Sequence, residues 1–181
     1  MPAYNRDWHD VQVNYSLSNH EAIGVSSFYR DGRNSRSEFG IGQYNQILRR
    51  WNESDAQANV NASIGFGGRH DSVEGEGVAA YGALEGDYET RRVYGQLSAE
   101  TLQSKDSVRF SRYRGRMGIA PYLASFESLQ TWLVLQVDYM PEMEESLRIT
   151  PMGRFFYGGF ILEAGVSLED SIPFVAAASH F

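Results

Sequence analysis

Residues 56–67 alternate strictly between apolar side chains and small or polar ones. Ala, Val, Ile and Phe occupy the even positions from Ala56 to Phe66, and Gln, Asn, Ser and Gly occupy the odd positions. Six uninterrupted repeats of period two predict a β-strand, because successive side chains of a strand point to opposite faces. This strand has one apolar side and one polar side, so the fold must place its two sides in different environments.

Ten further segments show the same alternation or a close form of it, separated by polar turns. The eleven segments are residues 11–18, 22–29, 39–51, 56–67, 78–85, 92–101, 108–122, 129–139, 147–157, 160–168 and 172–181. The phase breaks within residues 39–51, where a bulge and a short helix over residues 46–51 both fit. No linker or internal repeat divides the chain, so residues 1–181 are predicted to form a single domain. Its first eight residues form an N-terminal segment or, as residues 3–9, a further short strand.

Composition excludes several classes of protein. The chain has 181 residues, a net charge of −7, no Cys and four His. The acidic balance argues against a nucleic-acid partner, and the missing Cys excludes disulfides and thiolate metal sites. The four His have no metal-ligand spacing, so neither a metal nor another cofactor is predicted. No apolar run approaches the roughly 20 residues of a membrane helix. Residues 1–5 lack the features of a signal peptide, so we expect a mature chain with Met1 added for expression.

The polar faces of the segments carry most of the arginines together with several carboxylates. The charged residues predicted to lie on these faces are Arg92, Arg112, Arg114, Arg116, Arg148, Arg154, Glu85, Glu100, Asp138 and Glu163. Arginine–carboxylate pairing would satisfy these charges in a confined interior, so we predict a lumen charge network. The row Arg112, Arg114 and Arg116 is then either a packed lumen row or the lining of an anion-attracting path.

The apolar faces carry aromatic residues, many of them near the segment ends. The predicted interface aromatics are Tyr15, Tyr29, Trp51, Trp132, Tyr139 and Tyr157. An apolar outside with aromatic ends and a polar inside is typical of a barrel that crosses a bilayer, whose strands have about 9–11 residues. The predicted fold class is therefore all-β: a transmembrane antiparallel up-and-down β-barrel. An even number of strands is expected, ten or twelve, with eight as the smaller alternative.

The C-terminal segment carries a family resemblance. Pro173, Val175, Ala177, Ser179 and Phe181 share one face, and the chain ends on the aromatic residue. Val175, Ala177 and Phe181 resemble the C-terminal assembly signal of Gram-negative outer-membrane β-barrels, whereas Ser179 departs from the apolar residue usual there. Residues 118–122, 131–138 and 154–157 look like those of a group of small uncharacterised proteobacterial barrels. The resemblance implies an outer-membrane location, contact with lipid and lipopolysaccharide, insertion by the barrel-assembly machinery and a monomeric state.

The pattern supports three functions. The first is an outer-membrane barrel that is structural or provides a narrow path for a solute or ion. The second is a lipid-modifying outer-membrane enzyme, which needs a Ser, His and carboxylate cluster at one rim; no Gly-x-Ser-x-Gly motif selects a nucleophile. The third is a soluble β-barrel that binds an apolar ligand, which needs the apolar faces to point inward.

Overall fold

The computed structural model describes residues 8–31, 36–104, 109–124, 128–143 and 146–179, which form eleven β-strands. Their bounds are β1 Trp8–Ser16, β2 Glu21–Asp31, β3 Arg36–Asn52, β4 Ala56–Asp71, β5 Gly75–Thr90, β6 Val93–Ser104, β7 Arg109–Ile119, β8 Gln130–Tyr139, β9 Leu147–Tyr157, β10 Phe160–Val166 and β11 Pro173–Ser179. Within these ranges no helix has the length and apolar character needed to cross a membrane.

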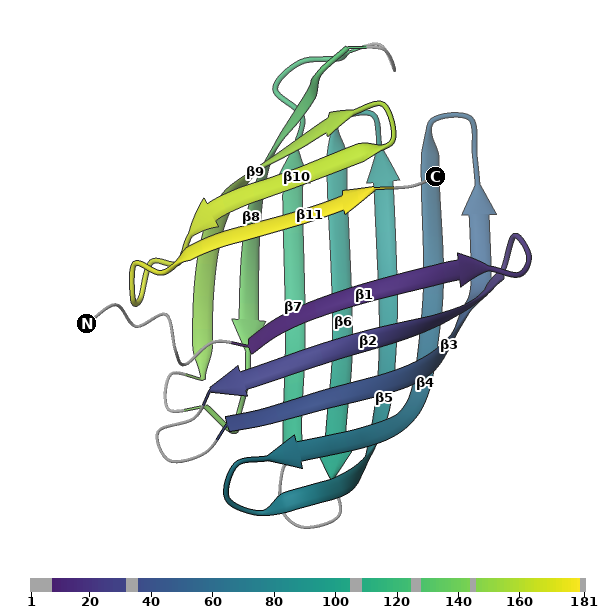
Figure 1. Cartoon of the computed structure of the whole chain (residues 1–181). Coiled ribbons are helices and arrows are strands. Elements are labelled where there is room, and N and C mark those ends of the chain that lie inside the picture. Colours follow the sequence, from purple (N-terminus) through teal and green to yellow (C-terminus); the bar gives the residue numbers. More distant parts are fainter. Residues whose placement is uncertain (1–7, 32–35, 105–108, 125–127, 144–145, 180–181) are drawn as a thin grey trace. The chain divides into compact units, whose positions relative to one another are not determined.

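All eleven strands belong to one sheet, in which their order is their order in the chain (Figure 1). Consecutive strands pair antiparallel, as in β1–β2, β2–β3 and the run from β7 to β11. The predicted all-β, up-and-down arrangement is confirmed. The predicted strand number of ten or twelve is wrong for the described residues, because each of the eleven alternating segments forms its own strand. Of the proposed additional strand at residues 3–9, Trp8 and His9 belong to β1 and the rest lies outside the described residues.

Two local predictions are corrected by the strand boundaries. The alternative of a helix over residues 46–51 is wrong, since β3 continues as a strand to Asn52 and pairs Gln46 with Glu21 of β2. The polar turns predicted between residues 67 and 78 and between residues 85 and 92 are shorter than expected. β4 extends to Asp71, and β5 continues through residues 86–90 to a turn at Arg91 and Arg92. Polar and charged residues whose sequence resembles a loop therefore belong to paired strands.

The chain divides into two compact units. Unit 1 comprises Met1–Arg49, Val60–Glu85 and Ala99–Arg112. Unit 2 comprises Arg50–Asn59, Gly86–Ser98 and Tyr113–Phe181. The long strands β3, β4, β5, β6 and β7 contribute to both units.

Both units expose apolar side chains and bury polar ones. In unit 1, Phe66 is 75% exposed while Ser26 and Gln43 are buried. In unit 2, Met117 is 74% exposed while Asp138 and Glu163 are 4% and 6% exposed. The burial is thus the reverse of that in a small water-soluble barrel, whose interior is apolar.

The buried faces also contain apolar side chains in both units. In unit 1 the buried members include Phe28, Phe39, Ile41, Leu102 and Phe110. In unit 2 a cluster forms from Tyr94, Ala120, Trp132, Val134 and Met152. The inner side is therefore mixed, and the apolar residues there pack beside buried hydrogen-bonded groups.

The sheet is strongly curved within each unit, because side chains meet across three strand spacings. Three spacings along a flat sheet amount to about 14 Å. In unit 1 the rings of Phe28 on β2 and Tyr81 on β5 are nevertheless 5.5 Å apart. In unit 2 Arg116 on β7 reaches Glu163 on β10, at 3.3 Å. Such contacts form only on the concave side of a curled sheet.

Glycines permit β3 and β4 to approach each other closely in unit 1. A Cβ atom at Gly67 would overlap the carbonyl oxygen of Gly40 and lie 2.9 Å from the Cα of Ile41. A Cβ atom at Gly65 would lie 2.6 Å from the Ile41 side chain. Both glycines follow the apolar–small alternation of residues 56–67, so the small side of that pattern serves this close contact.

Candidate functional site: a buried charge network

β7 places its arginines on the buried face. The side chains of Arg112, Arg114 and Arg116 are 13%, 18% and 10% exposed. Met117 and Ile119, at the alternate positions, are exposed. The period of two along a strand separates the two sets, as the sequence predicts.

In unit 2, Arg114 and Arg116 bond to residues directly opposite them on β8. The register pairs Arg114 with Asp138 and Arg116 with Gln136. Arg114 Nε donates to Asp138 Oδ1 at 2.6 Å, and Arg116 Nε donates to Gln136 Oε1 at 2.7 Å. Gln136 Nε2 in turn donates to Asp138 Oδ2 at 2.6 Å. The buried amide of Gln136 therefore joins the two arginines into one hydrogen-bonded chain.

Glu163 on β10 extends this chain to a third arginine. Arg154 of β9 lies opposite Glu163, and its Nε donates to Glu163 Oε1 at 2.5 Å. Arg116 Nη1 lies 3.3 Å from the same oxygen. Arg154 also stacks on the Tyr94 ring, with its guanidinium carbon 4.3 Å from the ring centroid, and donates to the Tyr94 hydroxyl at 3.4 Å. One carboxylate oxygen thus serves two guanidinium groups.

We call this set the charge network; it consists of Tyr94, Arg114, Arg116, Gln136, Asp138, Arg154 and Glu163. It contains three guanidinium groups and two carboxylates. Burying such groups costs several kcal/mol per ion, and only a complete set of partners offsets that cost. Sharing of acceptors makes the members interdependent, so removal of either carboxylate leaves a buried positive charge without its counterion.

In unit 1, Arg112 pairs with a carboxylate. Its Nε forms an ion pair with Glu100 Oε1. The Tyr81 hydroxyl donates to the other oxygen of Glu100 at 3.1 Å. Glu85, also predicted for the lumen, is half-buried in β5.

The remaining predicted arginines lie near strand ends. Arg148 Nη2 forms an ion pair with Asp170 at 3.0 Å, in the turn between β10 and β11. The neighbouring Glu169 accepts a hydrogen bond from the main-chain N–H of Ile149 at 2.9 Å, which holds the pKa of Glu169 below its ordinary value. Arg92 differs from the prediction, because it is exposed in the turn after β5.

No family model, curated protein or solved structure matches the chain. Three features of the described residues bear on function: the charge network, the exposed apolar face and a cavity in unit 2.

The predicted interface aromatics fall into three groups: exposed, half-buried and buried. Tyr15 in unit 1 and Trp51, Tyr139 and Tyr157 in unit 2 are exposed. Tyr29 is half-buried, and the guanidinium of Arg36 lies 5.0 Å from its ring centroid.

Trp132 corrects the prediction, because it is 5% exposed and lies edge-on to Tyr94 at 6.4 Å on the buried face. Trp132 lies on the same face of β8 as Val134 and Gln136. The alternation of side chains along β8 was therefore the signal that could have assigned Trp132 to the buried face. The sequence reasoning also missed Tyr113, which stacks on its cross-strand partner Tyr139 at 6.2 Å.

Two residues of the predicted assembly signal, Val175 and Ala177, lie in the last described strand. Val175 and Ala177 are exposed on β11, on the face opposite half-buried Phe174 and Ala176. Phe181 lies outside the described residues. β11 pairs with β10 over its whole length, from Pro173 opposite Val166 to Ser179 opposite Phe160.

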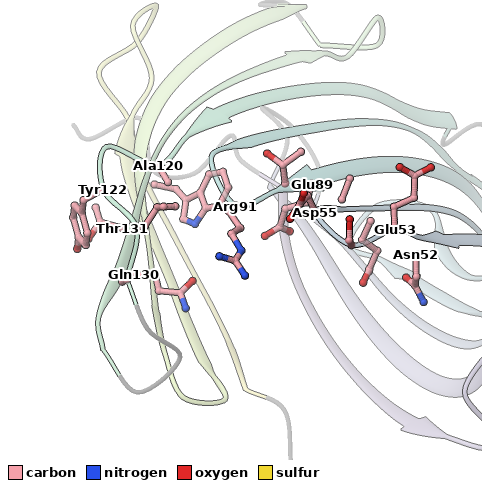
Figure 2. A pocket seen from close by; sticks show the side chains of 16 residues that line it. Asn52, Glu53, Asp55, Glu89, Arg91, Ala120, Tyr122, Gln130 and Thr131 are labelled. Atoms are coloured by element: carbon pink, nitrogen blue, oxygen red, sulfur yellow. The ribbon is translucent and has the colours of Figure 1, made fainter.

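A cavity of about 790 Å³ opens in unit 2, at the end of the strands where β3 passes into β4 (Figure 2). Its walls come from the β3–β4 and β5–β6 turns and from the segments at the end of β7 and the start of β8. Among the described residues no group of three or more His, Asp or Glu is arranged to hold a metal ion. In unit 1, His70 Nδ1 lies 2.6 Å from Glu76 Oε1, and both side chains are exposed.

Proposed function

We propose that this protein is a transmembrane β-barrel of the bacterial outer membrane. In this proposal the barrel is structural, and its charge-paired interior leaves at most a narrow path for ions or small solutes. The observation that carries the proposal is the inverted burial: large apolar side chains lie outside while arginines, carboxylates and amides lie inside. In a bilayer the exposed apolar side chains would contact lipid, which removes them from water. A soluble barrel that binds an apolar ligand requires the opposite burial.

Strand lengths and exposed aromatics support a bilayer as the surroundings. β8 and β9 have 10 and 11 residues, which matches the 9–11 residues of a tilted strand that crosses a membrane. In unit 2, exposed aromatics occur near both ends of the strands. Trp51, Tyr88, Tyr157 and Phe160 lie at the end formed by the β3–β4, β5–β6 and β9–β10 turns, and Tyr113 and Tyr139 lie toward the other end. Aromatic girdles at both interfaces are a feature of outer-membrane barrels.

Closure of the sheet is the second part of the proposal. In the described sheet β1 pairs only with β2, and β11 pairs only with β10. Open edges do not occur within the hydrocarbon region, since each unpaired N–H or C=O group there costs several kcal/mol. The sharp curvature within each unit also favours a closed sheet. Residence in the outer membrane, contact with lipopolysaccharide and insertion by the barrel-assembly machinery are further parts of the proposal, and the resemblance of Val175 and Ala177 in β11 to an assembly signal supports them.

The first test is refolding with and without detergent. We expect the chain to refold only in detergent or lipid, and to migrate differently on a gel when it is loaded unheated and when it is boiled. A closed barrel resists the gel detergent until it is heated, whereas an unfolded chain gives one mobility. A soluble, folded monomer in detergent-free buffer would overturn the proposal.

A charge on the outer face gives a second test. Met117 lies opposite Leu135, near the middle of β8, so Met117→Arg places a guanidinium near the bilayer midplane. In lipid vesicles we expect a loss of about 2–4 kcal/mol in the free energy of unfolding. The control is Val73→Arg, in the turn between β4 and β5, because Val73 is 70% exposed and Met117 is 74% exposed. Equal, near-zero effects of the two substitutions would mean that the face of Met117 contacts water.

A further inference from the structure

The cavity in unit 2 has two walls of different chemistry. In the view of Figure 2, Glu53, Asp55 and Glu89 are drawn on one side, and Gln130 and Tyr122 on the other, with Arg91 between them. The turns that supply the first wall follow β3 and β5, so alternation of strand direction brings them to the same end of the sheet.

The charged side chains of this cavity do not pair with one another. In the ranges that the structure describes, no hydrogen bond or ion pair engages the side chains of Glu53, Asp55, Glu89 or Arg91. The charge network of the same unit behaves differently, because each of its arginines is bonded to an acceptor. Three carboxylates and one guanidinium give the cavity a formal charge of −2, with both signs available to a ligand.

The second wall is held in place by its own contacts. The Tyr122 hydroxyl donates to the main-chain oxygen of Leu129 at 3.0 Å and lies 2.8 Å from the Thr131 hydroxyl. Trp132 is fixed beside Tyr94 in the buried cluster. A wall that is held in place before binding loses little conformational entropy when a ligand enters.

We infer that this cavity binds a small solute that carries one carboxylate and more than one ammonium group, as a basic amino acid or basic dipeptide does. The ammonium groups pair with the carboxylates of Glu53, Asp55 and Glu89, and the solute's carboxylate pairs with Arg91. A purely cationic polyamine meets the Arg91 charge without a counterion, and an acidic solute meets three carboxylates. The volume lies within the usual range of small-molecule sites, about 300–1,000 Å³.

The test uses the full chain in the medium in which it folds, with lysyl-lysine as the probe and titration calorimetry as the measurement. We expect saturable binding with a Kd of about 1 mM or tighter. The same dipeptide with an amidated C-terminus lacks the carboxylate, so it should bind about tenfold more weakly. Glu89→Gln should weaken binding of both peptides.

Arg91→Gln is the decisive variant. It should weaken binding of lysyl-lysine and abolish the difference between the free and amidated dipeptides, because no guanidinium is left to recognise the carboxylate. Glu76→Gln, in unit 1 and outside the cavity, is the control and should leave both affinities unchanged.

Absence of saturable binding would overturn the inference, as would equal affinities of the two dipeptides for the unaltered protein. An equal loss in the Glu76→Gln control would also overturn it, because the attraction would then be an effect of net charge. The inference does not depend on the membrane proposal. Heat-modifiable migration of the same samples reports that proposal separately.

Discussion

Gly67→Ala is expected to prevent the protein from reaching its folded state under conditions in which the unaltered chain refolds. The new methyl group would overlap the carbonyl oxygen of Gly40, and its next neighbours are main-chain atoms 2.8 and 2.9 Å away. A flexible side chain could move aside, but here two paired strands must separate. We expect a loss of about 3 kcal/mol or more in the free energy of unfolding, at or beyond the upper end of the usual cost of overpacking.

The matched control is Gly82→Ala in β5. Both glycines lie within strands of unit 1, but a Cβ atom at Gly82 meets nothing within 4 Å. Alanine in place of a strand glycine there should change the free energy of unfolding by no more than about 1 kcal/mol. Denaturant titration in micelles measures both variants. If Gly67→Ala proves as stable as Gly82→Ala, β3 and β4 do not approach each other as described.

Glu163→Gln should destabilise the protein by about 3–5 kcal/mol, the usual cost of breaking a buried ion pair by removing one partner. Glutamine keeps the size of the side chain and one acceptor oxygen. However, it removes the negative charge that faces both Arg154, at 2.5 Å, and Arg116, at 3.3 Å. Two buried guanidinium groups then lose their common counterion.

Glu76→Gln provides the control for this second substitution. Glu76 also contacts a basic residue, His70, but its side chain is 80% exposed, so water replaces the lost contact. We expect an effect within about 0.5 kcal/mol. Denaturant titration of both variants in the same detergent gives the comparison, and equal effects would contradict a buried network.

Planar-bilayer recordings of the same variant address the ion path. If the interior of the barrel conducts, Glu163→Gln should shift the selectivity toward anions, because the charge network then has two more guanidinium groups than carboxylates. Unchanged selectivity in a conducting barrel would place the path away from Glu163. No conductance from either protein would leave the structural role.

The strands were largely predictable from the sequence, because alternation is a local signal. All eleven predicted segments overlap the observed strands. Boundaries were missed where glycine, polar and charged residues continue a strand, as at residues 68–71 in β4 and 86–90 in β5. The even strand number was expected because known single-chain barrels have even numbers of strands. No residue pattern in this chain indicates it.

The site was predictable in composition but not in pairing. Parity along β7 places Arg114 and Arg116 on one face, yet Glu163 lies three strands away and no local pattern reveals that the sheet curls enough to join them. The sequence predicts Trp132 at the membrane interface. β8 carries apolar residues on both of its faces, so its pattern does not show which face is buried. Only the depth of burial around Tyr94 and Met152 shows which face of β8 points inward.

The long reach of the charge network has a consequence for the order of events in folding. Its contacts between Arg116 and Glu163 and between Arg154 and Tyr94 join residues 47 and 60 positions apart in the chain. Hairpins such as β9–β10 close short loops and can form early, whereas these contacts need four consecutive strands in place. The long-range contacts of the charge network therefore form late in folding. Their loss should accelerate unfolding and leave the refolding rate nearly unchanged.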